Sequence, residues 1–140
     1  RRVLFRSSLE YLDRAEKIQG PYLALAHKQA IALIRSGRRE EAQAALEQMA
    51  QLLQSAQDVT EADRLKCQEA YMECQEGHLE SPAYLELLER LIQTLKRDCH
   101  FGHLYFYRDR MLEACTRQRK YKRALEFEGE ISSMVIKSGI

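Results

Sequence analysis

The sequence predicts an all-α protein, an α-solenoid of antiparallel helical hairpins with about seven helices. Apolar residues recur at helical spacing along most of the chain, and no stretch shows the strict alternation of a strand. Residues that break helices are rare, with six glycines and two prolines among 140 residues. The periodic segments come in pairs joined by short links, which is typical of helical hairpins.

The first complete helix pair is predicted over residues 21–56. Pro21 is placed to open its first helix, because proline suits the first helical position. Gly37 ends that helix, since glycine tolerates a left-handed conformation. Glu40 and Glu41 then occupy the first turn of the second helix, where acidic groups suit the helix dipole. The apolar positions of the pair are Leu23, Ala26, Ala30, Leu33, Ile34, Ala42, Ala45, Leu46, Met49, Leu52 and Leu53.

A second helix pair is predicted over residues 60–97. Thr60 is the expected N-cap of a helix that continues to about residue 76 and stops at Gly77. Ser81 and Pro82 signal the next start, a capping hydroxyl followed by proline at the first helical position. The apolar anchors of this pair are Ala62, Leu65, Tyr71, Met72, Leu87, Leu88, Leu91, Ile92 and Leu95.

A third pair is predicted over residues 103–137, and residues 8–19 fit the second helix of an incomplete pair. Gly129 lies inside the last helix, where it costs about 1 kcal/mol relative to alanine. A close approach of two helices at this position would explain the glycine. The apolar positions of the third pair are Leu104, Tyr107, Met111, Ala114, Cys115, Tyr121, Ala124, Leu125, Phe127, Ile131 and Val135.

Residues 1–7 match the translation of a common sequencing adapter end. We therefore expect them to be an artefact, and the chain to be a fragment of a larger bacterial protein whose repeat domain covers residues 8–140. Without Arg1, Arg2 and Arg6 the net charge changes from +1 to −2. No overall basic excess then favours a nucleic-acid partner.

A repeat is visible in the spacing of small residues. Ala42, Ala83 and Ala124 each fall near the start of a predicted second helix, at intervals of 41 residues. A regular interval of this size is typical of arrays in which each hairpin packs on its neighbours.

One segment resembles the tetratricopeptide repeat more specifically. Its small and large residues alternate around a turn glycine in the family's order: Ala30, Leu33, Gly37, Ala42, Leu46 and Met49. Tyr121, Ala124 and Phe127 are similar to the start of a second helix in that family, although Arg119 takes the place of the turn glycine. The resemblance covers about residues 8–137 and implies the fold; a fold does not identify a function.

The resemblance also implies a binding surface. In tetratricopeptide arrays the first helices line a concave face that holds an extended peptide or a helix. The asparagine-rich carboxylate clamp of chaperone-binding members is missing, because the chain has no asparagine. The positions transferred to this chain are His27, Ile31, Ile34, Arg35, Cys67, Tyr71, Cys74, Phe106, Asp109, Glu113 and Arg117.

The sequence favours neither catalysis nor a cofactor. It has no glycine-rich phosphate loop, nucleophile elbow or zinc-protease motif. Cys99, His100 and His103 are the one cluster of ligand-like residue types, but a closed zinc site needs about four ligands, so we expect no metal. The four cysteines are expected to be reduced thiols in the cytoplasm.

The charges are unevenly distributed. Five of the seven residues over 117–123 are basic, and residues 60–95 carry an excess of acids. The basic run is either a solvated turn or a surface that orients an acidic ligand or a neighbouring domain. One short basic turn is weak evidence for nucleic acid.

Together these features predict a non-catalytic protein- or peptide-binding domain, a scaffold or adaptor. No apolar stretch approaches the roughly 20 residues that span a membrane. One alternative is a ligand-sensing regulatory arm of a bacterial signalling protein or transcriptional regulator, with its output domain outside this sequence. A second is a structural spacer that self-associates through its end faces.

Overall fold

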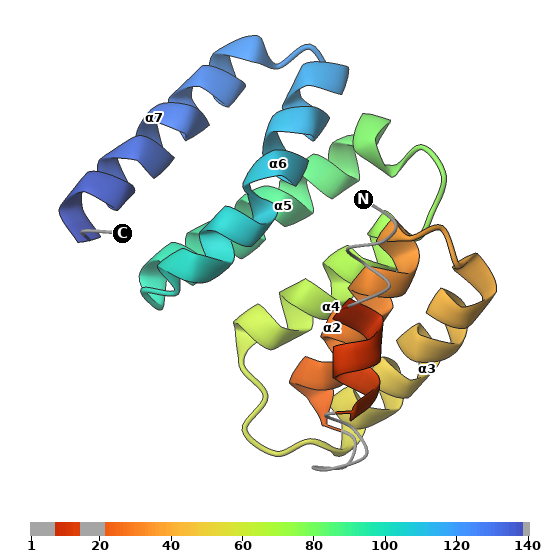
Figure 1. The fold of residues 1–140 in the computed structure, drawn as a ribbon. Coiled ribbons are helices and arrows are strands. Elements are labelled where there is room, and N and C mark those ends of the chain that lie inside the picture. The colour runs from red at the N-terminus through yellow and green to blue at the C-terminus, as the bar shows by residue number, and fades with distance from the viewer. Residues whose placement is uncertain (1–7, 15–21, 139–140) are drawn as a thin grey trace. The chain divides into compact units, whose positions relative to one another are not determined.

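The computed structural model describes residues 8–14 and 22–138, with side chains placed up to Met134. Within these residues every regular element is a helix and no strand is present, which confirms the all-α prediction (Figure 1). Counting a short helix over residues 8–14, the described part of the chain holds seven α-helices. The expectations for residues 1–7 and 15–21, including Pro21 as a helix start, lie outside the described residues.

The chain divides into two compact units, Arg1–Glu76 and Gly77–Ile140. The division falls inside the segment 60–97, which the sequence predicts as one helix pair. Its two helices therefore belong to different units. Each unit is described by itself.

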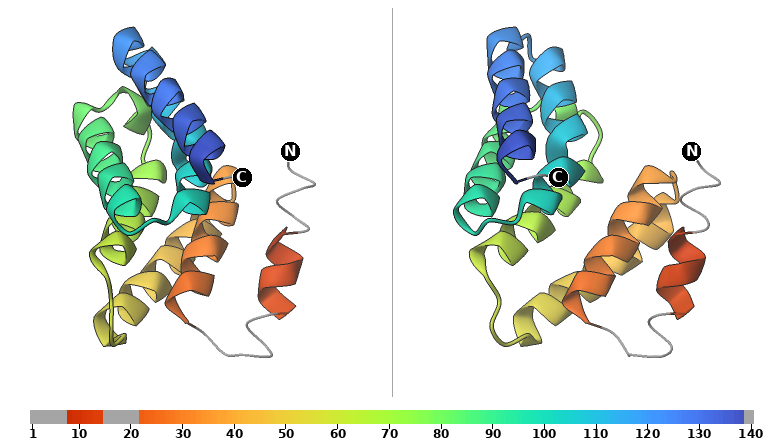
Figure 2. Two further views of the ribbon diagram at one scale, coloured as in Figure 1. Left: turned by 90° about the vertical axis from the view of Figure 1, so that its left-hand side faces the viewer. Right: turned by 60° about the vertical axis from the view of Figure 1, so that its left-hand side comes forward.

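Unit 1 contains α2 (Leu23–Arg35), α3 (Arg39–Ser55) and α4 (Glu61–Glu73), together with the short helix over residues 8–14. Helices α2 and α3 form an antiparallel hairpin, and α4 packs on both (Figures 1 and 2). The buried core of this unit consists of Ala26, Ala30, Ile31, Leu46, Met49, Cys67 and Ala70. A second cluster joins the helix at 8–14 to α2 through Leu9, Leu12, Leu25 and Ala32.

The predicted N-cap of α4 is confirmed. Thr60 Oγ1 accepts a hydrogen bond from the amide of Asp63, and the Asp63 carboxylate accepts one from the amide of Thr60, both at 3.1 Å. This reciprocal capping box satisfies two amides that a helix start would otherwise leave unbonded.

The predicted end of α4 is wrong by one turn. The helix ends at Glu73 rather than near residue 76, and the Gln75 amide bonds the carbonyl of Met72, which tightens the last turn. Gly77 then takes a left-handed conformation with φ +71° and leads into the 3₁₀ helix η1 (His78–Glu80), for which the sequence carries no separate prediction.

Unit 2 contains η1, α5 (Pro82–Arg97), α6 (Phe101–Arg117) and α7 (Tyr121–Ser138). Helix α6 packs against both α5 and α7 (Figure 1). Pro82 occupies the first turn of α5 as predicted, but the Ser81 side chain makes no capping hydrogen bond. The apolar face predicted for α5 is buried; its residues are Leu87, Leu88, Leu91, Ile92 and Leu95.

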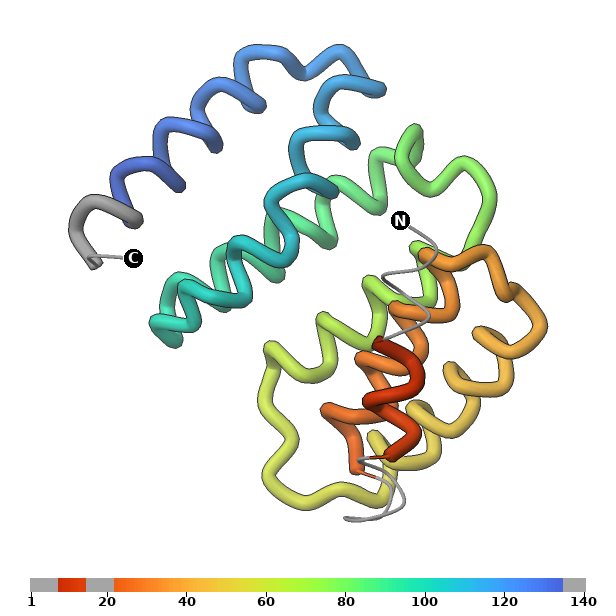
Figure 3. Tube along the Cα trace, viewed as in Figure 1, coloured from red at the N-terminus to blue at the C-terminus, as the bar shows by residue number. Residues whose placement is uncertain are grey.

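Three helix-to-helix turns share one geometry, and they can be followed along the tube in Figure 3. Gly37, Cys99 and Arg119 each have positive φ, at 80°, 59° and 60°. In each turn this residue's amide bonds back three residues, and the next residue's amide bonds back five, which is the Schellman pattern. The predicted turn glycine at position 37 and its replacement by Arg119 are therefore confirmed as turn positions.

The turns also set a common register for the helices that follow them. The residue twelve positions after the turn is Met49, Met111 or Ile131, and each is buried. The alanines 41 residues apart do not occupy equivalent environments, because Ala42 is fully buried whereas Ala83 is exposed.

The explanation offered for Gly129 is wrong. A Cβ atom added at this residue meets nothing within 4 Å, and the position is exposed. No close helix approach requires glycine there.

Candidate functional site

A surface pocket of about 390 Å³ lies in unit 1, where the C-terminal ends of α2 and α4 come close to the start of α3. Two of the predicted binding residues, Ile34 and Cys74, line it, and both are half-buried. The complete lining is Ile34, Gly37, Arg39, Glu73, Cys74 and Glu76. The pocket thus combines apolar wall with charged groups.

A third predicted residue, Arg35, reaches the same region through an ion pair. Its Nε lies 2.8 Å from Glu73 Oε1, and only 2% of the Glu73 side chain is exposed. A charge-assisted hydrogen bond of this length compensates the carboxylate for its loss of water. Arg35 therefore positions Glu73, one of the pocket's two carboxylates.

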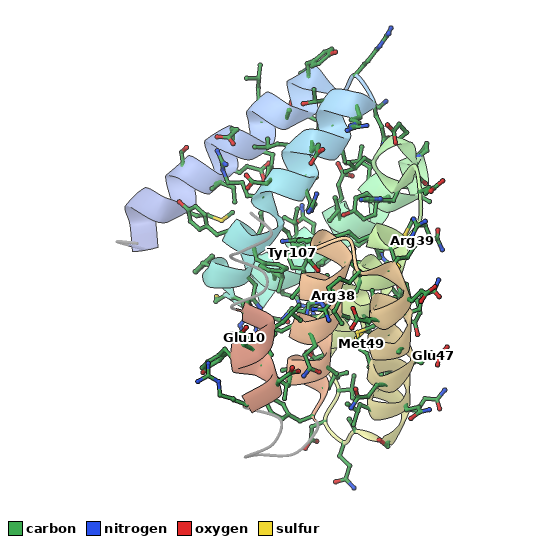
Figure 4. The ribbon with its side chains drawn as sticks, turned by 45° about the vertical axis from the view of Figure 1, so that its right-hand side comes forward. Glu10, Arg38, Arg39, Glu47, Met49 and Tyr107 are labelled. Atoms are coloured by element: carbon green, nitrogen blue, oxygen red, sulfur yellow. The ribbon has the colours of Figure 1, made fainter. Side chains whose placement is uncertain are left out.

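Arg39 spans the rim of the pocket from α3 to the end of α4. Its Nη1 lies 3.3 Å from Glu76 Oε1, and its Nη2 donates to the carbonyl of Cys74, also at 3.3 Å. Both charged side chains are more than half exposed, at 54% and 87%. Such long, exposed contacts hold the guanidinium weakly. The neighbouring Arg38, labelled with Arg39 in Figure 4, precedes α3 and pairs instead with Glu41 in the first turn of that helix.

His27 is a predicted binding residue with an unusual environment. Burial and the nearby ammonium of Lys66 lower its pKa to about 4. Its Nε2 atom is buried without a hydrogen-bond partner. The imidazole is therefore neutral at physiological pH.

Two of the predicted residues belong to the core. Ile31 is 4% exposed and Cys67 is 2% exposed, and both pack in the unit 1 cluster. Burial raises the pKa of the Cys67 thiol to about 11, so it stays protonated at neutral pH. Neither side chain offers a contact surface to a partner. Helical spacing places both on the inner side of their helices, and the family pattern alone did not distinguish that side from the binding face.

Tyr71 lies at the surface of unit 1 and is 40% exposed. Its hydroxyl donates to the carbonyl of Leu46 at 3.0 Å, which ties α4 to α3. Partial burial also raises the pKa of this phenol. The ring is available to a partner, while the hydroxyl already has one.

The four predicted residues in unit 2 all lie on α6. Phe106 is 43% exposed and makes an edge-to-face contact with Tyr107. Asp109 pairs with Arg108 at 3.0 Å. Glu113 and Arg117 are one helical turn apart, with oxygen and nitrogen 3.6 Å apart. These side chains form a mixed apolar and charged helix surface, and none of them lines the unit 1 pocket.

The basic run at 117–123 is partly neutralised within unit 2. Arg117 pairs with Glu80 at 2.8 Å, and its guanidinium lowers the pKa of that carboxyl. Arg123 pairs with Glu89 at 3.0 Å. The acidic and basic segments noted in the sequence therefore meet each other, which removes much of the reason to assign the basic run to an outside ligand. Arg119, Lys120 and Lys122 remain exposed.

The cluster of cysteine and histidine at the start of α6 forms a stacked pair rather than a chelating group. The rings of His100 and His103 are 5.3 Å apart and nearly parallel. Across the residues with assigned positions, no group of three or more histidine, cysteine or acidic side chains is arranged to hold a metal ion.

Sequence reasoning missed four residues of the pocket: Gly37, Arg39, Glu73 and Glu76. The sequence predicts Gly37 only as a turn, includes Glu73 and Glu76 only in the acidic excess of residues 60–95, and gives no role to Arg39. The contacts that join them link positions 35 or more apart in the chain. Hydrophobic periodicity does not indicate such long-range pairs. Helical spacing within α4 could have suggested one feature of the site, namely that Glu73 lies on the face of α4 that meets α2.

Among the helices whose positions are described, none is long and apolar enough to cross a membrane. Comparison with known proteins gave no match to any family model, curated protein or solved structure.

Proposed function

We propose that this chain is a non-catalytic protein- or peptide-binding domain built as a tetratricopeptide-like array of helical hairpins. The observation that carries the proposal is the unit 1 pocket, which gathers Ile34 and Cys74 beside the Arg35–Glu73 pair. Three residues named from the family pattern thus converge on one concave feature. Concave sites with apolar walls and a few fixed polar groups are the usual form of a binding site.

The turns support the array part of the proposal. The same turn recurs at Gly37, Cys99 and Arg119, and each is followed twelve residues later by a buried large side chain. Repetition of one hairpin geometry is what a solenoid requires. The free thiols, two of them buried, fit the further proposal of a reducing cytoplasmic setting.

The test is binding of a random octapeptide library to the whole chain, compared with two variants. Ile34→Gln changes a half-buried residue of the pocket wall, whereas Leu125→Gln changes a side chain that is 75% exposed on α7. We expect Ile34→Gln to weaken the selected peptides about tenfold, as loss of an apolar anchor does, and Leu125→Gln to leave them unchanged. Equal affinities in both variants, with circular dichroism showing intact helices, would remove the pocket from the proposal.

The second candidate is a ligand-sensing regulatory arm. In this proposal the same pocket binds the ligand, and the output lies in another domain of a longer protein. The complete coding sequence decides between the two. An attached DNA-binding or nucleotide-cyclising domain favours the sensor, and repeats alone favour the adaptor.

A further inference from the structure

The unit 1 pocket has a definite electrostatic character. The C-terminal ends of α2 and α4 both border it, and helix C-termini carry partial negative charge. Two carboxylates, Glu73 and Glu76, add to this field. Glu73 is neutralised by Arg35 at 2.8 Å, so the charge balance of the open part depends on Glu76 and Arg39.

The contacts of Arg39 indicate which chemical group the edge of the pocket can bind. The guanidinium of Arg39 bonds Glu76 Oε1 and the Cys74 carbonyl together, one through each terminal nitrogen. A carboxylate on the α4 side and a helix-terminal carbonyl therefore form a ready-made pair of acceptors for a cation. Ile34 and Cys74 supply the apolar wall that the methylene stem of such a side chain needs.

The hold of Arg39 on these acceptors is weak. Both contacts are 3.3 Å long, and the two charged side chains are 54% and 87% exposed. Exposed pairs of this kind contribute little and exchange readily. An acidic ligand is disfavoured in the same place, since it would face Glu76 and two helix C-termini.

We propose that the pocket binds a basic side chain, lysine or arginine, of a partner peptide, and that this side chain displaces Arg39 from Glu76 and the Cys74 carbonyl. The inference rests on the proposed peptide-binding function and names the chemistry of its partner. Arg39 then bonds these two acceptors only while no partner is bound, and its side chain moves into solvent when the partner binds.

The test uses three random octapeptide libraries fixed at the central position as arginine, glutamine or glutamate, bound to the whole chain. We expect the arginine library to bind best. Glu76→Gln should weaken that binding about three- to tenfold, the size expected when one partner of an exposed interfacial pair is lost. Arg39→Ala should strengthen it about threefold by removing the competitor.

Matched controls are adjacent. Arg38→Ala removes an arginine that pairs with Glu41 outside the pocket lining, and Glu40→Gln removes an exposed carboxylate of α3. Neither should change binding. N-acetyl-arginine amide, titrated into the isotopically labelled chain, should shift the amide resonances of Ile34, Gly37 and Cys74.

The outcomes separate the two levels of the proposal. Stronger binding of the glutamate or glutamine library, still lost in Ile34→Gln, keeps the peptide-binding function and overturns the basic partner. Binding of the arginine library that Glu76→Gln and Arg39→Ala leave unchanged also overturns it. If no library binds, the proposed function fails together with the inference.

Discussion

The guanidinium of Arg35 on α2 and the carboxylate of Glu73 on α4 form an ion pair across the interior of unit 1. Nε and Oε1 are 2.8 Å apart, and only 15% and 2% of the two side chains are exposed. Helix α4 thus docks on α2 through charge as well as through its apolar residues Cys67 and Ala70. The pair connects the stability of unit 1 with the pocket that Glu73 lines.

Removal of the cation should therefore destabilise unit 1. Arg35→Met keeps the aliphatic bulk but leaves the Glu73 carboxylate buried without this partner, and we expect a loss of about 3 kcal/mol in the free energy of unfolding. Urea denaturation followed by circular dichroism measures it. Arg38→Met breaks the exposed pair with Glu41 and serves as the control that should change stability little. Equal effects of the two substitutions would show that burial of the Arg35 pair does not matter.

His27 should make unit 1 sensitive to acid. Its pKa is about 4 in the folded chain, against 6.5 for an unperturbed imidazole. Below pH 6.5 His27 binds a proton in the unfolded chain but stays neutral in the folded chain. The free energy of unfolding therefore has its full value above pH 6.5 and falls as the pH drops toward 4. The total loss is about 3 kcal/mol.

His27→Gln should abolish this part of the pH dependence, and His100→Gln, at an exposed histidine in unit 2, should not. Urea unfolding between pH 7 and pH 4 gives the comparison, with amide hydrogen exchange of α2 and α4 as the local readout. A wild-type slope retained in His27→Gln would contradict the assignment to this residue.

Gly129 offers a stabilising substitution. Alanine at this exposed helical position meets no atom within 4 Å, so Gly129→Ala should raise the free energy of unfolding by about 1 kcal/mol through its better helix propensity. Gly37→Ala is the contrasting change, because φ is +80° there and a side chain strains the turn. Thermal melts should shift in opposite directions for the two variants. A fall in the melting temperature of Gly129→Ala would mean that the glycine has a role that the described contacts do not show.

Arg119 should be improved by glycine but not by alanine. Its φ of +60° costs a residue with a Cβ atom more than glycine, so Arg119→Gly should stabilise unit 2 by about 0.5–1 kcal/mol. Arg119→Ala removes the same charged side chain and keeps the backbone strain, which makes it the matched control. If the two variants have the same unfolding midpoint, the turn is not strained.

Features that depend on residues close together in the chain were predicted correctly from the sequence. Thr60 with Asp63 closes a capping box, and the apolar stripe of α5 is buried as predicted. These features are local, because each depends on residues within one or two helical turns. The sequence misplaces the end of α4, because Gly77 is a typical helix stop but lies at the start of η1, and α4 is already capped at Cys74.

The candidate site was less predictable for a physical reason. Ile34 and Cys74 were named from the resemblance to the tetratricopeptide family, but the same resemblance also named Ile31, which is buried. Neighbouring helical positions differ by about 100° around the axis, so a small error in which face meets the core changes the assignment. The ion pair between Arg35 and Glu73 depends on how α4 docks, and spacing within either helix does not specify that.

The repeated turn has a consequence for how such hairpins are recognised in other sequences. A search that requires glycine at the turn would find the hairpin at Gly37 and miss those at Cys99 and Arg119, although all three share the same hydrogen bonds. A profile that ignores the turn residue and requires a large apolar side chain twelve positions later would retrieve all three, through Met49, Met111 and Ile131. Diverged hairpins of this kind are better detected by what they bury than by the residue that bends the chain.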